Sequence, residues 1–149
     1  MVAYHVLISE QNILVESALA MIKNDHHGAI DIFVGVVRNH HQGQIVTGIT
    51  YDVHILLAKG VLATICQEAE KKWQGTNYYV AHYHGYLPVG GISVLIAVSA
   101  PHRTDSFDAC RYVIEEIKKR APVWKREHYP DGSSTWLPGH SLHQGLGNG

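Results

Sequence analysis

A short cationic block near the C-terminus, residues 118–127, contains the side chains best suited to chemistry. Five of the chain's twelve Lys and Arg residues fall in these ten positions, although the whole chain carries a net charge of only −1. A local cation cluster in a near-neutral protein predicts a discrete anion site, not a surface that coats a polyanion. Pro122 interrupts the block, and the residue before a proline disfavours helix. Lys118 is therefore expected at a helix end, and Lys125 on the extended segment that follows.

A second candidate anion site is the segment Pro101-His102-Arg103, which lies between a predicted strand and a predicted helix. The free N–H groups at a helix start bind anions, and His102 and Arg103 would add charge-assisted donors. The alternative is that Arg103 only caps the helix or pairs with Asp105 or Asp108. The sequence leaves these two interpretations equally open.

Arg38, at the end of a predicted strand beside a polar loop, is the fifth candidate group. Taken singly, each cation is more often solvated or structural: Lys118 can pair with Glu115 one turn earlier, and Trp124 beside Lys125 can simply fill core. Together with His102 and Arg103 these residues form one site only if the fold brings them together.

Composition limits the class of protein. The chain has 149 residues, of which 46% are hydrophobic, and this predicts one domain at residues 1–137 with a flexible tail at 138–149. No apolar run approaches the roughly 20 residues of a membrane span, and the N-terminus lacks the pattern of a signal peptide. Cys66 and Cys110 fall in predicted helices, which favours buried thiols in a reducing cytoplasm over a disulfide framework. A pI near 6.9 gives no support for nucleic-acid binding.

Histidine is over-represented, with twelve residues, and three close pairs could suggest a metal site: His26 and His27, His40 and His41, and His82 and His84. No Cys-x-x-Cys or His-Glu-x-x-His pattern supplies further ligands, so neither a metal nor a cofactor is predicted. A histidine-rich metal-binding protein remains a third hypothesis. Asp31 and Asp52 are isolated acids, which gives little support for a paired-carboxylate mechanism.

Hydrophobic periodicity predicts an α+β chain. Strands are expected at 2–8, 29–38, 45–53, 77–86 and 92–100, and helices at 11–23, 55–73 and 104–119. The strands at 29–38 and 45–53 are expected to pair as an antiparallel hairpin, and residues 123–136 to form a second, small one. Thr104 is the expected N-cap of the last helix. Mixed hairpins and helices favour α+β over a doubly wound parallel sheet.

Three segments, in the same order, resemble signatures of the large, catalytic subunit of molybdopterin synthase, and the match runs over residues 28–136. The residues that carry it are Gly28-Ala29, Phe33, Gly35 and Arg38, then His102-Arg103 and Phe107, then Lys118, Pro122, Trp124-Lys125 and Glu127.

The resemblance implies an α/β-hammerhead fold with antiparallel strands, two to three helices and a small C-terminal hairpin. It implies a sulfurtransferase of molybdenum cofactor biosynthesis, built as a homodimer at the centre of a heterotetramer. Each protomer would bind a small ubiquitin-like sulfur carrier whose Gly-Gly C-terminus bears a thiocarboxylate. Two sulfurs would pass to cyclic pyranopterin monophosphate and form the dithiolene of molybdopterin. No ubiquitin-like domain is fused to this chain, so the donor would be a separate one.

The same resemblance assigns roles to residues. Lys118 would be the central catalytic residue, with Lys125 beside it. Arg38, His102 and Arg103 would bind the phosphate and pterin. One arrangement of these three residues spans the dimer interface. Phe33 and Pro122 would shape the pocket.

The chain departs from the family pattern at His82-Tyr83, where His-Arg is common, at Gly91, where an acid is common, and at residues 52–54. The alternative function is a non-catalytic anion- or nucleotide-binding module. Intact Lys118 and Lys125 argue against it, because phosphate binding alone would not require both.

Overall fold

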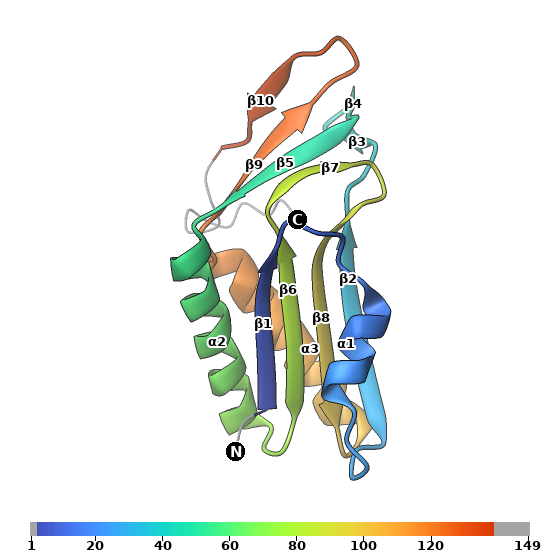
Figure 1. Cartoon of the computed structure of the whole chain (residues 1–149), viewed down its shortest axis with the longest axis vertical. Coiled ribbons are helices and arrows are strands. Elements are labelled where there is room, and N and C mark those ends of the chain that lie inside the picture. Colours follow the sequence, from blue (N-terminus) through green and yellow to red (C-terminus); the bar gives the residue numbers. More distant parts are fainter. Residues whose placement is uncertain (1–2, 139–149) are drawn as a thin grey trace.

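Two four-stranded sheets form the framework of the computed structural model, which describes residues 3–138 (Figure 1). The first has the strand order β1-β6-β8-β2 and the second β10-β9-β5-β7. The strands are β1 (Ala3–Ser9), β2 (Ala29–Val36), β3 (His40–His41), β4 (Gln44–Ile45), β5 (Gly48–Val53), β6 (Asn77–Tyr83), β7 (Gly85–Pro88), β8 (Ile92–Ala100), β9 (Val123–His128) and β10 (Ser134–Trp136), and the helices are α1 (Val15–Ile22), α2 (Ile55–Lys72) and α3 (Arg103–Arg120). The α+β prediction is confirmed.

The first sheet is covered on both faces, which explains the nearly continuous apolar run of its central strands. β1 pairs with β6 in parallel, and the other pairs are antiparallel. Alternate side chains point to opposite faces. One set, including Val80 and Ile96, packs under α2 and α3, whereas the other, including Ala81 and Leu95, packs under α1. Figure 1 shows α1 on one face and α3 on the other.

The helices α2 and α3 pack together through side chains at helical spacing. Leu62, Ile65 and Ala69 of α2 and Val113 and Ile117 of α3 are all buried in one cluster with the first sheet. These helices differ from the predicted ranges 55–73 and 104–119 by no more than one residue at each end. Long periodic segments are the most reliably predicted elements.

The second sheet is centred on β5, which pairs with β7 on one side and β9 on the other, both antiparallel. Lys125 on β9 lies directly opposite Tyr51 on β5, so the two side chains emerge on the same face. Tyr51 is buried with Val37 and Leu87, and this face therefore looks inward. Trp124 and its partner Asp52 point outward, and both are exposed.

The predicted hairpin between residues 29–38 and 45–53 is wrong. β2 pairs with β8 in the first sheet, whereas β5 belongs to the second sheet. A short hairpin, formed by the two-residue strands β3 and β4, lies between them in the sequence. It turns at Gln42 and Gly43, both with positive φ. The polar loop therefore does hold a tight turn, but the long strands on either side find better partners elsewhere.

The predicted strand 77–86 is in fact two strands. β6 ends at Tyr83, and Gly85, with φ of 126°, redirects the chain into β7 of the second sheet. Such a φ strongly favours glycine, so this residue marks the change of sheet. The hairpin of β9 and β10 is confirmed.

Two helix starts also differ from the predictions. His102, not Thr104, is the N-cap residue of α3, and it makes no side-chain capping bond. The first helix begins at Val15, four residues later than expected from a range of 11–23. The predicted tail at 138–149 lies outside the described residues except for Pro138. Along the part of the chain that is described, no helix is both long and apolar enough to cross a membrane.

Candidate active site

Three cations from distant parts of the sequence interact at one place, the junction of the two sheets. Lys118 lies in the last turn of α3, Lys125 lies on β9, and Arg38 follows the end of β2. Burial, and to a smaller extent the charges of Lys118 and Arg38, together lower the pKa of Lys125 to about 8. Burial and the charge of Arg38 also lower the pKa of Lys118. We call Arg38, Lys118 and Lys125 the cation cluster.

Local structure explains how the two lysines come to lie together. α3 ends at Arg120, and Ala121 and Pro122 carry the chain in an extended conformation into β9, as the proline predicts. The carbonyl of Pro122 accepts a hydrogen bond from the N–H of His54, 3.2 Å away, just before α2. The junction of α3 and β9 is buried at Ala121 and Pro122, and Lys118 and Lys125 lie on either side of it.

Arg38 is held in place through its neighbour Val37. The N–H of Val37 donates to the carbonyl of Gly91 at 3.0 Å, and the N–H of Gly90 donates to the carbonyl of Val37 at 2.8 Å. A Cβ atom added at Gly91 would approach Leu87 Cδ2 to 2.9 Å, so the acid common in the resembled family would require a local shift here. The departure at Gly91 thus affects the segment that supports Arg38.

His82 is a buried residue next to the cation cluster, near enough for the charges of Lys118 and Lys125 to act on it. Its Nδ1 lies 2.9 Å from the carbonyl oxygen of Tyr83, which places a proton on Nδ1. Burial lowers the pKa of His82 to about 4, and the charges of Lys118 and Lys125 act in the same direction. The ring is therefore neutral at pH 7 and packs edge-on against Tyr51, with centroids 5.5 Å apart.

Glu127 is the acid that acts on the pKa of Lys125, and it raises that pKa. It is buried, and its carboxylate accepts bonds from Nδ1 of His41 at 2.8 Å and from the hydroxyl of Tyr129 at 3.0 Å. Within residues 3–138, the side chains of the cation cluster form no hydrogen bond or ion pair of their own. The cluster is thus under-neutralised and suited to bind anions.

His102 and Arg103 do not join the cluster within one chain. They lie at the first turn of α3, and the helical rise puts Arg103 about 22 Å from Lys118. Both side chains are exposed. Across the described chain, Arg103 makes no ion pair with Asp105 or Asp108, so the alternative interpretation of this arginine gains no support either.

The two predicted pocket-shaping residues, Pro122 and Phe33, lie in different parts of the fold. Pro122 is buried at the junction of α3 and β9. Phe33 is in the middle of β2 and partly exposed; because Ile32 and Val34 pack on the α1 side, Phe33 faces the α3 side.

Sequence reasoning missed His82 and Glu127 as parts of the site. A histidine that directly follows the hydrophobic residues 78–81 of β6 was a signal, since a buried imidazole needs a defined partner. Tyr83, the departure next to it, packs between two hydrophobic clusters and puts an aromatic ring where the resembled family has a cation.

The other candidate chemistries find no support in the described residues. No group of three His, Cys, Asp or Glu side chains in residues 3–138 is arranged to hold a metal. His84 accepts a hydrogen bond from the N–H of Val53. Cys66 and Cys110 are free and buried, as predicted, and burial raises the pKa of both thiols to about 12. They are therefore poor nucleophiles.

Known proteins resemble this chain over most of its length. The sequence model of the MoaE protein family matches residues 8–120. A molybdopterin synthase catalytic subunit from Synechococcus elongatus is 46% identical over 142 residues, which are 95% of this chain and 86% of that protein. Molybdopterin synthase catalytic subunit 1 from Mycobacterium tuberculosis is 37% identical over 130 residues, covering 87% of this chain and 88% of the relative.

Solved structures agree. The crystal structure of molybdopterin synthase from Staphylococcus aureus superposes with a TM-score of 0.84 at 38% identity, covering 94% of this chain and 99% of that one. A chain from the complex of subunits 1 and 2 of the molybdopterin-converting factor of Helicobacter pylori shares the fold, with a TM-score of 0.68 at 22% identity over 89% of this chain and 88% of that one. The family match, the relatives and the shared fold together place this chain in the MoaE protein family.

Proposed function

We propose that this protein is the catalytic subunit of a molybdopterin synthase, a sulfurtransferase of molybdenum cofactor biosynthesis. In this role it transfers two sulfurs from the C-terminal thiocarboxylate of a small ubiquitin-like partner to cyclic pyranopterin monophosphate. The observation that carries the proposal is the convergence of Arg38, Lys118 and Lys125 into one under-neutralised cluster. Relatives of the same family named as molybdopterin synthase catalytic subunits support it.

The two substrates suit this cluster because both are anions. The pterin carries a phosphate, and the partner's tail ends in a thiocarboxylate. Each transfer joins the sulfur of one thiocarboxylate to a carbon of the pterin, where it replaces an oxygen substituent, so two partner molecules supply the two sulfurs. The acyl C–S bond of the tail breaks, and a water oxygen takes the place of the sulfur to leave a carboxylate. Negative charge develops on the acyl oxygen in that step, and a fixed cation stabilises it.

We assign this stabilising role to Lys118, whose pKa is lowered by burial and by Arg38. A lysine whose pKa is lowered also gives up its proton more readily than an ordinary lysine. Lys125 and Arg38 then bind the anionic groups of the pterin and the tail, and Pro122 and Phe33 shape the walls. His102 and Arg103 bind phosphate only if a second subunit brings them to the cluster.

The partner is a separate small subunit, and the solved Helicobacter pylori complex of two subunits supports this assembly. We further propose that a homodimer of this chain forms the centre of a heterotetramer. The two free, buried thiols support a reducing cytoplasm as its place of action.

Reconstitution tests the function directly. Purified protein is mixed with a thiocarboxylated ubiquitin-like partner and cyclic pyranopterin monophosphate, and molybdopterin is assayed. Product that requires both proteins and the thiocarboxylate is the expected result. A verified complex with the partner that yields no product would contradict the proposal and favour a non-catalytic anion-binding module.

A further inference from the structure

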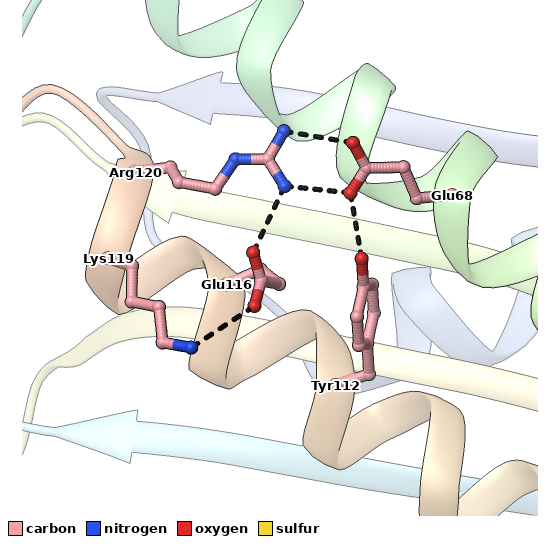
Figure 2. A network of polar contacts seen from close by, with 5 residues as sticks. All are labelled: Glu68, Tyr112, Glu116, Lys119 and Arg120. Carbon is pink, nitrogen blue, oxygen red and sulfur yellow. Dashed lines mark hydrogen bonds and ion pairs between the residues drawn. The ribbon is translucent and has the colours of Figure 1, made fainter.

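A network of polar side chains joins α2 to the last turns of α3 (Figure 2). Lys118 of the cation cluster lies in the last turn of the same helix. The guanidinium of Arg120 donates from Nη1 to Oε1 of Glu68 at 2.7 Å and from Nη2 to Oε2 at 3.1 Å. The hydroxyl of Tyr112 donates to the same Oε1 at 2.8 Å. One carboxylate of α2 therefore holds two points of α3 that lie roughly two turns apart.

Arg120 lies between the two lysines in the sequence, at the end of the helix that precedes β9. It is the last residue of α3, so Lys118 lies just before it and Lys125 follows after the turn at Pro122. Arg120 also bonds to Glu116, one turn earlier, at 3.1 Å. Residues two apart on a helix project on nearly opposite sides. The network thus grips α3 on the side opposite to Lys118.

Repulsion within the cation cluster favours movement of the end of α3, and the network opposes that movement. Like charges repel: Arg38 disfavours the charged form of both lysines, and Lys118 disfavours the charged form of Lys125. The last turn of a helix has carbonyls without helical partners and frays readily. A bidentate ion pair at Arg120 opposes this fraying, because a guanidinium fork fixes direction as well as distance.

Stability alone does not account for this network. The side chains of Glu68 and Arg120 are about one-third exposed, at 37% and 33%, and ion pairs of this kind add little to stability. The two helices already share a buried apolar contact that includes Leu62, Ile65 and Val113. Loss of the ion pair should leave the helices packed and free only the helix end.

We propose that the Glu68–Arg120 pair positions the end of α3 and so maintains the separation of Lys118 and Lys125 that sulfur transfer requires. This inference rests on the function proposed above. The bonds of Glu68 and Arg120 run to each other and to Tyr112 and Glu116 on α3, so we assign both as positioning residues.

The test compares Glu68→Gln, which keeps the shape of the side chain but removes its charge, with Glu115→Gln as the matched control. Glu115 also pairs on α3, with Arg111 at 3.8 Å, but it does not bridge to α2. For each protein kcat, KM and the melting temperature are measured. The titration of the lysine amines is followed by NMR, which does not depend on turnover.

We expect Glu68→Gln to lower kcat roughly tenfold or more, because small misplacements of a reacting group are costly, while KM changes little. Released from the grip, the ammonium groups move apart, so the pKa of Lys125 rises. Arg120→Lys keeps the charge but loses the fork, and it should show the same two effects. Glu115→Gln should behave as the unaltered protein.

A normal kcat and an unchanged Lys125 titration in Glu68→Gln would overturn the proposal, whatever happens to the melting temperature. If Arg120→Lys fails to fold, Glu68→Gln still decides. If the unaltered protein shows no turnover, the proposed function fails. The positioning role is then judged by the lysine titration alone: an unchanged pKa of Lys125 in Glu68→Gln overturns it, and a raised one supports it.

Discussion

Lys118 and Lys125 lie on different elements, a helix end and a strand, and the charge of Lys118 lowers the pKa of Lys125. The residues between them, including the buried Ala121 and Pro122, form the turn that brings the two ammonium groups into one site. Two cations held together in a partly buried place cost free energy. Such a cost is common at sites whose ligands are anions.

Replacing Lys118 should separate catalysis from binding. Lys118→Ala is expected to lower turnover by at least about a hundredfold, because the developing charge loses its stabilising cation. The affinity for the small subunit, measured by calorimetry, should change little. The pKa of Lys125 should rise, since a repelling charge is gone. Lys71→Ala, an exposed lysine of α2, is the control. Near-full turnover in Lys118→Ala would refute the catalytic assignment.

Lys125 should destabilise the free protein at neutral pH. Its pKa of about 8, against an ordinary 10.5, corresponds to up to about 3 kcal/mol of unfavourable free energy. Between these two pH values the unfolded chain binds more protons than the folded one, so the free energy of unfolding rises with pH. Lys125→Met should therefore be more stable at pH 7, and its advantage should shrink toward pH 10. Urea unfolding measures this, with the exposed Lys59→Met as control.

A constant difference between Lys125→Met and the unaltered protein across that pH range would show that Lys125 titrates normally in the folded state. The lysine would then lie in a better-solvated place than its position opposite Tyr51 indicates.

Arg103 and Lys118 should belong to one site only across two subunits, since about 22 Å separates them along α3. Arg103→Ala and Lys118→Ala proteins should each have low activity. Mixed, unfolded and refolded together, they should recover about a quarter of normal turnover, because half of the dimers carry one intact composite site of two. No recovery on mixing would exclude a shared site and leave His102 and Arg103 outside the reaction.

His82 should make the protein sensitive to acid. Its folded pKa of about 4 is below the ordinary 6.5, so the unfolded chain binds more protons between these values. The free energy of unfolding therefore falls as pH drops from 6.5 toward 4. His82→Gln should lessen this dependence in urea titrations at pH 5 and pH 7. His26→Gln, at an exposed turn, should not. Equal acid sensitivity in all three proteins would contradict the burial of His82.

The long helices and the alternating strands could be predicted from sequence because their signals are local. The turn at Pro122 was predictable for the same reason, and it correctly places Lys118 on helix and Lys125 on strand. Sheet membership was not predictable. The pairing of β2 with β8 depends on which apolar faces meet across the whole fold, and no local signal distinguishes it from a hairpin with β5.

The candidate site also has a part that the sequence predicts and a part that only tertiary contacts define. The cationic block was visible in the sequence, but the approach of Arg38 to it depends on bonds between Val37 and residues 90–91. The pairing of Glu68 with Arg120 joins residues 52 positions apart, on two helices whose relative placement only the packed core defines. Contacts of this kind carry no sequence pattern.

Gly85 sends the chain out of the first sheet for a single short strand, β7, before β8 returns to it. β5 and β9 make comparable excursions, so the second sheet is assembled from three separate visits of the backbone together with β10. No single cut of the chain would separate the two sheets from each other and leave each with all its strands. We therefore expect residues 1–137 to unfold in one cooperative step, and fragments that end before β9 to be degraded in the cell because β5 would be left with an unpaired edge.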